Sequence, residues 1–176
     1  MTWLTRRLVV SMSMPGKYFL IRILISSSNF FFILDTMEIV ASFKEKLDGF
    51  VYAQIIYELG VKFGKCLVII ERQGPGETVL LQLKNTLRYP NMYYHKMAKA
   101  DVLKTQKQSK FGFWQGANTR LLGGNHFEKV ILSGQLKIYS EDVISELHTW
   151  IWDTDGKRRH APGKHDDLIM ACTMGM

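Results

Sequence analysis

Three acidic residues lie where apolar chain segments begin or end. Asp166 and Asp167 come directly before the apolar residues 168–171, and Glu71 directly follows the apolar run 66–70. Carboxylates are rarely buried unless they are paired or bind a metal. Acids at the end of a buried strand and at the start of a helix can together hold a divalent cation. The simpler alternative is that Asp166 caps the helix and Asp167 only complements its dipole.

The chemistry open to such a cluster is metal-dependent hydrolysis of a phosphodiester. Two metal ions about 3.5–4 Å apart can activate a water molecule and stabilise the leaving oxygen, and nearby lysines and arginines attract the phosphate backbone. His165 could act as a general base or a ligand, although a histidine beside a helix start is commonly a surface residue. The sequence has neither a phosphate-binding Gly-x-x-x-x-Gly-Lys-Ser/Thr loop nor a Gly-x-Ser-x-Gly elbow, so a self-contained ATPase or a serine hydrolase is not expected.

The composition suits one globular domain with a polyanionic partner. The chain has 176 residues, 47% of them hydrophobic and 22% charged, and a formal net charge of +7. The positive balance favours association with a polyanion. Cys66 and Cys172 both lie in apolar runs, so we expect small core residues and neither a disulfide framework nor a zinc site.

Strand and helix patterns alternate from residue 35 onward, which predicts an α/β fold with a central sheet. Asp48 and Ser140 are candidate helix N-caps, and Asp155-Gly156 is a hairpin turn. Gly123 and Gly124 are unfavourable inside the predicted helix 118–132. The predicted strands are 37–43, 66–70, 92–94 and 136–139, and the other predicted helices are 49–63, one beginning at Pro75, and one capped by Ser140.

Residues 96–117 form a basic and aromatic stretch. It contains Lys107 and Lys110, followed by an aromatic group at 111–114. Lysines fit phosphates, and aromatic side chains can stack on bases or pack beneath a loop. A solvated, lysine-rich flexible loop is the alternative.

The first 34 residues differ from the rest. Residues 8–10 have the pattern of a strand, and residues 18–34 have a strand composition that favours a β-hairpin. Arg6 and Arg7 before an apolar run resemble a signal peptide or anchor, but the run is interrupted by Arg22 and by the polar residues 26–29. It is not clean enough to span a membrane, and we expect no stable membrane association.

An ordered series of motifs resembles the C-terminal nuclease domain of the large terminase subunit of tailed bacteriophages. The resemblance covers about residues 35–172, and its pieces are residues 68–76, 89–93, 110–113, 119–120, Ser140, 146–147, Trp150 and 163–171. It implies an RNase H-like fold, with a central mixed sheet flanked by helices. It also implies an endonuclease that uses Mg²⁺ or Mn²⁺ to cleave concatemeric double-stranded DNA during packaging.

The resemblance assigns roles to several residues. Glu71 is the metal-binding acid on the central strand, and Asp167, with Asp166 beside it, is the C-terminal metal-binding acid, Asp167 being favoured as the direct ligand. The expected DNA-binding residues are Lys107, Lys110, Arg120, Lys164 and His165. The implied partners are double-stranded DNA, the terminase ATPase domain, the small terminase subunit and the portal, and the implied location is the packaging motor at the procapsid portal in the host cytoplasm.

The chain departs from the family pattern at its two ends. The family's first strand carries an aspartate that supplies a third metal ligand; here the matching strand is taken as residues 8–13, with Ser13 at that position. We therefore divide the chain into an atypical N-terminal segment, 1–34, and a nuclease domain, 35–176, that lacks the ATPase motor and ends early. We hypothesise a fragment whose first strands were altered, for example by a change of reading frame within residues 12–34. Loss of one ligand should lower metal affinity and rate, leaving an impaired nuclease.

Three other functions fit part of the sequence. A catalytically inactive DNA-binding or motor-docking module would use the same basic stretch and Arg120. A junction resolvase would have the same fold type but prefer branched DNA. A membrane-anchored protein depends only on residues 18–34.

Overall fold

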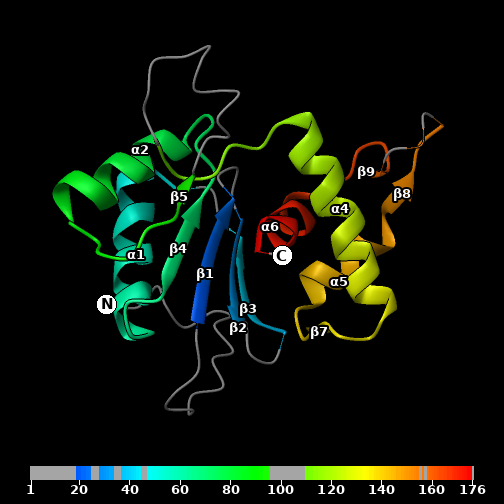
Figure 1. The fold of residues 1–176 in the computed structure, drawn as a ribbon, viewed down its shortest axis with the longest axis horizontal. Helices are drawn as coiled ribbons and strands as arrows, with labels where there is room; N and C mark the ends of the chain where they lie inside the picture. The colour runs from blue at the N-terminus through cyan, green and yellow to red at the C-terminus, as the bar shows by residue number, and fades with distance from the viewer. Residues whose placement is uncertain are drawn as a thin grey trace.

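A five-stranded mixed sheet forms the centre of the molecule, with strands in the order β4-β1-β2-β3-β7 (Figure 1). The computed structural model describes residues 19–24, 28–33, 37–44, 47–95, 110–154, 156 and 158–175. β1 (Phe19–Leu24), β2 (Ser28–Ile33) and β3 (Glu38–Lys44) form an antiparallel meander. β4 (Leu67–Ile70) runs parallel to β1, and β7 (Lys137–Ile138) runs parallel to β3. The sheet is therefore mixed, as the α/β RNase H-like prediction requires.

Helices cover both faces of this sheet (Figure 1). On one side lie α1 (Gly49–Lys62) and α2 (Gly76–Leu81), which continues into the π-helical turn η1 (Gln82–Thr86). On the other side lie α4 (Ala117–Leu132), α5 (Glu141–His148) and α6 (Asp167–Gly175). Two small hairpins complete the described part of the chain: β5 (Tyr94–His95) pairs with β6 (Lys110–Phe111), and β8 (Trp150–Trp152) pairs with β9 (Arg158–His160).

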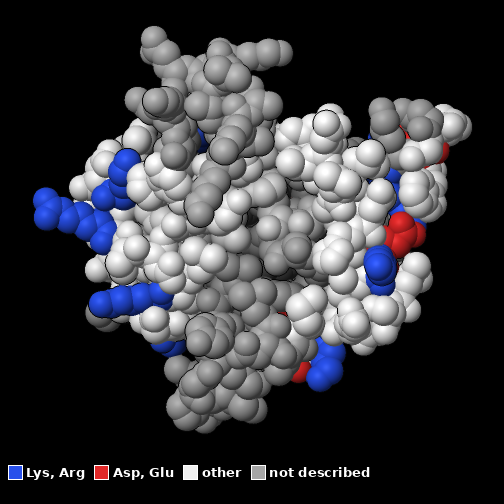
Figure 2. Space-filling model, in the orientation of Figure 1, with Lys and Arg blue, Asp and Glu red and all other residues white. Residues whose placement is uncertain are grey.

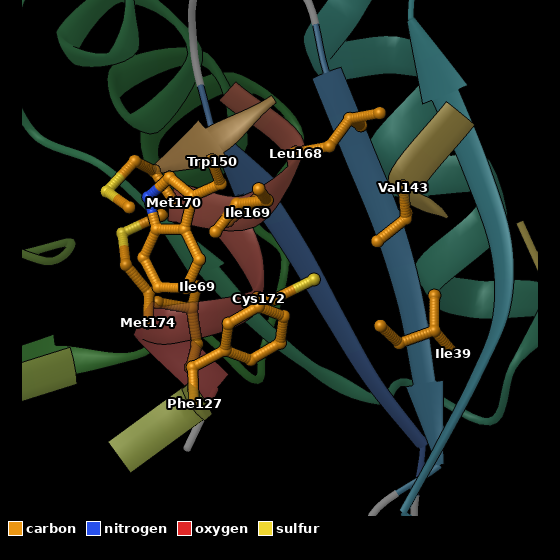
Figure 3. Close-up of a cluster of buried hydrophobic side chains, with 11 residues drawn as sticks. Ile39, Ile69, Phe127, Val143, Trp150, Leu168, Ile169, Met170, Cys172 and Met174 are labelled. Carbon is orange, nitrogen blue, oxygen red and sulfur yellow. The ribbon is translucent and has the colours of Figure 1, made fainter. Parts of the chain in front are cut away.

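The alternation of side chains along β4 divides the hydrophobic core into two clusters. Val68 and Ile70 pack with the buried residues of α1 and α2. Ile69 points to the opposite face and packs with α4, α5 and α6. Figure 3 shows this second cluster, to which α6 contributes most of the side chains. A strand buried on both faces explains why residues 66–70 are continuously apolar.

Most of the local predictions are confirmed. Asp48 caps α1 by accepting a hydrogen bond from Phe50 N–H at 2.8 Å, and Ser140 caps α5 by accepting one from Val143 N–H at 3.4 Å. The hairpin at residue 156 is present as β8 and β9, and the hairpin predicted within residues 18–34 is present as β1 and β2. Cys66 and Cys172 are buried free cysteines. No helix in the described part of the chain is both long and apolar enough to cross a membrane.

Gly123 and Gly124, which have low helix propensity, lie inside α4 where this helix packs against Thr173 of α6 and Trp150 of β8. A Cβ atom on Gly123 would lie 3.0 Å from the Thr173 Cβ and 3.2 Å from the Thr173 carbonyl oxygen, whereas one on Gly124 would meet Trp150 no closer than 3.5 Å. Gly123 thus permits the close approach of α4 to α6. Glycine at position 123 is thus explained by a tertiary contact with Thr173, which the local sequence of the helix does not reveal.

Candidate metal centre

Glu71 directly follows β4, and its backbone lies beside that of Phe113. Phe113 N–H donates to the Ile70 carbonyl oxygen at 2.7 Å, and Arg72 N–H donates to the Phe113 carbonyl oxygen at 2.8 Å. These two bonds bracket Glu71 on both sides, so its backbone is fixed although the strand proper has ended. The side chain is half-buried and remains accessible from solvent.

The start of α6 brings the two aspartates to the same region. Asp166 is buried, and its carboxylate accepts a hydrogen bond from the Arg120 guanidinium at 2.7 Å. Asp167 is the first residue of the helix and is only partly buried. The N–H groups that an N-cap side chain usually satisfies, those of Leu168 and Ile169, donate instead to Glu146 Oε2, at 2.8 and 3.3 Å. The capping role considered for Asp166 is therefore filled by a glutamate from α5.

The pKa of Glu71 is affected by charged residues of α4 and α6. Burial raises the pKa of the Glu71 carboxyl above its ordinary value, the Arg120 guanidinium lowers it, and the charge of Asp167 raises it again. Glu71, Asp167 and Arg120 are thus close enough to interact electrostatically. Burial and a neighbouring carboxylate disfavour the ionised form of Glu71, and a further cation beside it would stabilise that form.

Arg120 is held in place by the first turn of α4. Gly116 N–H donates to Thr119 Oγ1 at 2.8 Å, and Arg120 N–H donates to the Gly116 carbonyl oxygen at 2.9 Å. The turn therefore fixes the backbone from which the Arg120 side chain reaches Asp166. The Arg120 side chain keeps 46% of its surface exposed, against 8% for the Asp166 side chain.

The acids fit one hard cation better than two. Both Glu71 and Asp167 offer only oxygen donors, and Mg²⁺ is commonly held by one or two carboxylates together with waters and substrate phosphates. Asp166 is engaged by Arg120. Within the described ranges, no group of three or more His, Cys, Asp or Glu side chains is arranged to hold a metal. Glu71 and Asp167 are therefore the candidate ligands for Mg²⁺ or Mn²⁺.

The strand beside Glu71 carries no acid. β4 has β1 on one side, where Ile23 pairs with Ile70, and on the other side it bridges to Met92. The described neighbour of the Glu71 strand is thus β1, whereas residues 8–13, and Ser13 with them, lie outside the described residues. β1 reads FLIRIL and has no Asp or Glu. The prediction that Ser13 stands where the family has a metal-binding aspartate therefore stays a prediction.

The predicted DNA-binding residues lie in different places. Lys164 and His165 are exposed and directly precede the acids, and Arg120 faces Asp166. Lys110 begins β6, and Lys107 lies outside the described residues. Figure 2 shows that, on the face viewed, positive side chains lie beside α1 and α2, whereas both signs of charge occur beside β8 and β9. The structure thus brings Arg120, Lys164 and His165 near the acids.

Glu146 is the residue whose role the sequence did not reveal. The sequence places Glu146 only within the motif series, at residues 146–147. A signal did exist: Glu146 is in the last turn of α5, where the helix dipole disfavours a negative charge. An acid at that position, in a helix that already has Glu141 and Asp142 in its first turn, suggests a partner outside the helix.

The fold is shared with solved nuclease domains of large terminases. The large terminase nuclease from thermophilic phage G20c with bound magnesium matches with a TM-score of 0.65 and 13% identity, over 92% of this chain and 81% of the other. The nuclease domain from Thermus phage P74-26 gives 0.62 and 15%, over 95% and 82%. The human cytomegalovirus terminase nuclease domain, soaked with Mn, gives 0.54 and 13%, over 89% and 82%. No protein-family model and no curated protein sequence matches the chain. The chain therefore has the RNase H-like fold of terminase nucleases.

Proposed function

We propose that this chain is a divalent-metal-dependent endonuclease domain that cuts double-stranded DNA during viral genome packaging. The observation that carries the proposal is the proximity of Glu71, at the end of β4, to Asp167, at the start of α6, whose charge contributes to raising the pKa of the Glu71 carboxyl. The likeness to terminase nucleases solved with cobalt or magnesium supports it. The proposed setting is the packaging motor at the procapsid portal, with the terminase ATPase domain and small subunit as partners.

Each charged group has a part in the proposed reaction. Glu71 and Asp167 hold Mg²⁺ or Mn²⁺, which when bound polarises the phosphodiester and lowers the pKa of a coordinated water. Arg120 holds the Asp166 side chain in place by a charge-assisted hydrogen bond. Lys164 and His165, exposed just before α6, contact the DNA backbone. Glu71 and Asp167 would supply two carboxylates to a bound metal, and waters and the substrate phosphate would supply its other ligands.

The missing acid of β1 limits the rate of this nuclease. A two-metal site needs carboxylates from several elements, and the side of Glu71 that faces β1 has none. We therefore propose a site that holds one cation firmly and a second only weakly. Cleavage should need millimolar rather than micromolar metal, and Mn²⁺, which accepts less regular coordination, should support it better than Mg²⁺.

Plasmid cleavage by the purified chain tests the proposal. We expect nicking with Mn²⁺, none in EDTA, and a loss of at least about 100-fold in both the Glu71→Gln and the Asp167→Asn variants, because each removes one charged ligand. Glu77→Gln, which neutralises an exposed acid in the first turn of α2, is the matched control and should cut like the parent. Cutting that persists in EDTA, or in both ligand variants, would show that the activity is not the one proposed.

A catalytically inactive DNA-binding or motor-docking module is the second candidate. It is favoured by two observations: β1 lacks an acid, and Asp166 is already neutralised by Arg120. Such a module would bind duplex DNA equally well with Mn²⁺ and with EDTA, and Glu71→Gln would leave that affinity unchanged. Failure of the parent to cut at any metal concentration, with DNA binding retained, would establish this second function.

A further inference from the structure

Glu146 contacts the start of α6, which carries the proposed metal ligand Asp167, although Glu146 and Leu168 are 22 positions apart in the sequence. Its Oε2 atom accepts hydrogen bonds from Leu168 N–H at 2.8 Å and Ile169 N–H at 3.3 Å. The side chain is buried, with only 8% of the residue exposed. A buried carboxylate needs hydrogen-bond donors, and the first turn of a helix offers unpaired N–H groups.

The capping by Glu146 releases the aspartates from local hydrogen bonds. In an isolated helix with this sequence, Asp166 would occupy the N-cap and accept a bond from the N–H two or three residues on. Here those N–H groups are taken by Glu146, and the Asp166 carboxylate turns to Arg120. The Asp166 backbone still starts the helix, since Met170 N–H donates to its carbonyl oxygen at 2.8 Å.

The same contact fixes where the helix begins relative to the sheet. α5, from which Glu146 projects, is anchored by Val143, which is fully buried in the cluster around α6. A second polar link joins the Glu71 segment to α6: Gln73 Nε2 donates to the Gln115 carbonyl oxygen at 3.0 Å, and Gln115 Nε2 contacts the Met170 sulfur at 3.6 Å. The start of α6 is thus tied to α5 on one side and to the loop after β4 on the other.

We propose that Glu146 is a positioning residue of the metal centre: it caps α6 from α5 so that Asp167 faces Glu71 and neither aspartate is used as a cap. This inference rests on the proposed function. Partners that orient metal ligands without touching the metal commonly change its affinity by 10- to 100-fold when they are removed. Glu146 acts in that way through the backbone of the helix rather than through a ligand side chain.

Metal binding without turnover gives the first readout. Titration calorimetry with Mn²⁺, in the absence of DNA, should show affinity about tenfold weaker in Glu146→Ala than in the parent. Glu146→Gln keeps an oxygen that can accept both N–H groups, so its affinity should stay within about threefold of the parent. Ser140→Ala is the matched control, because it removes the cap of α5 without touching α6; its melting temperature should fall while its Mn²⁺ affinity stays unchanged.

Amide hydrogen exchange gives a second readout that needs no metal. Exchange at Leu168 and Ile169 should accelerate in Glu146→Ala and stay slow in Glu146→Gln and Ser140→Ala. Unchanged exchange at these two amides in Glu146→Ala, or unchanged Mn²⁺ affinity once they exchange faster, would overturn the inference. A parent chain that bound no Mn²⁺ would instead overturn the proposed function, and the exchange rates would still decide whether Glu146 holds the start of α6.

Discussion

At the scale of single residues, the candidate site is a balance of four charges. Burial and Asp167 disfavour the ionised form of Glu71, whereas Arg120 favours it. Arg120 also pairs with Asp166, whose side chain is almost fully buried. One guanidinium thus faces acids from two different elements, and without a bound cation the carboxylates outnumber it. This arrangement should make the folded chain less stable than it would be with a neutral residue at position 71, a common feature of ligand sites.

Replacing Glu71 by Gln should therefore stabilise the metal-free chain at neutral pH. The raised pKa means that the ionised carboxyl costs stability; the cost is absent below the unfolded pKa, about 4.3, grows as the pH rises toward the folded pKa, and is constant above it. We expect the melting temperature of Glu71→Gln in EDTA to exceed that of the parent by roughly 1–3 °C at pH 7.5, since Glu71 is only half-buried, and to equal it near pH 4. Adding Mn²⁺ should raise the melting temperature of the parent but not that of the variant. A variant less stable than the parent at pH 7.5 would contradict this account.

At the scale of elements, the packing of α6 decides which residues can occupy α4. The two helices approach closely at Gly123, where the backbone of Thr173 lies in contact range. The next residue, Gly124, faces Trp150 with room for a methyl group. The two glycines have the same helix propensity but different surroundings. Comparing substitutions at the two positions therefore tests how closely α6, the helix that carries Asp167, approaches α4.

Alanine at these two positions should have opposite effects on stability. Gly124→Ala should stabilise the chain by about 0.5–1 kcal/mol through reduced backbone freedom. Gly123→Ala should lose that gain and destabilise the chain by about 1 kcal/mol, because the added methyl group would press on Thr173. Urea denaturation followed by circular dichroism measures both free energies of unfolding. Equal effects would mean that α4 and α6 are not held at the distance described.

At the scale of the whole molecule, the sheet separates two cores with different tasks. The cluster around α1 and α2 includes Val68 and Ile70 of β4, the strand that ends at Glu71, whereas the cluster around α4, α5 and α6 supports the segment that begins at Asp166. The formal charge of +7 acts over the entire surface and attracts DNA irrespective of its sequence. Lysines close to the candidate metal centre should therefore contact DNA, whereas distant lysines should only add to the net charge.

The salt dependence of DNA binding should identify the lysines in contact. For duplex DNA in EDTA, the logarithm of the affinity should fall linearly with the logarithm of the salt concentration, and Lys164→Gln should reduce the slope by about 0.9. Lys62→Gln, at the exposed end of α1, has the same change of charge and should leave the slope unchanged. Fluorescence anisotropy at several salt concentrations measures both slopes. Equal slopes for the two variants would exclude Lys164 from the contact surface.

Local patterns in the sequence were enough for most of the helices and for an α/β fold, whereas short strands such as β5, predicted at 92–94 and found at Tyr94–His95, were placed less well. Caps such as Asp48 and Ser140 act within a few residues, so their effect can be predicted from the sequence alone. Pairings across the molecule could not be predicted this way: Arg120 and Asp166 are 46 residues apart, and Glu146 reaches Leu168 over 22. The pairing of β1 with β4 is of the same kind, because nothing local in residues 19–24 specifies which strand they join.

The parallel pairing of β3 with β7 has a consequence for how fast the chain folds. Lys137 pairs with Glu38 through an ion pair at 3.1 Å, and the two residues are 99 positions apart. Closing so long a loop costs chain entropy before any strand contact is gained, and chains dominated by distant pairings reach the native state slowly. Until β7 docks, β3 is an open edge that can pair with another chain. A nascent or refolding chain is therefore most vulnerable to aggregation at β3, and dilution or a chaperone would protect it during that interval.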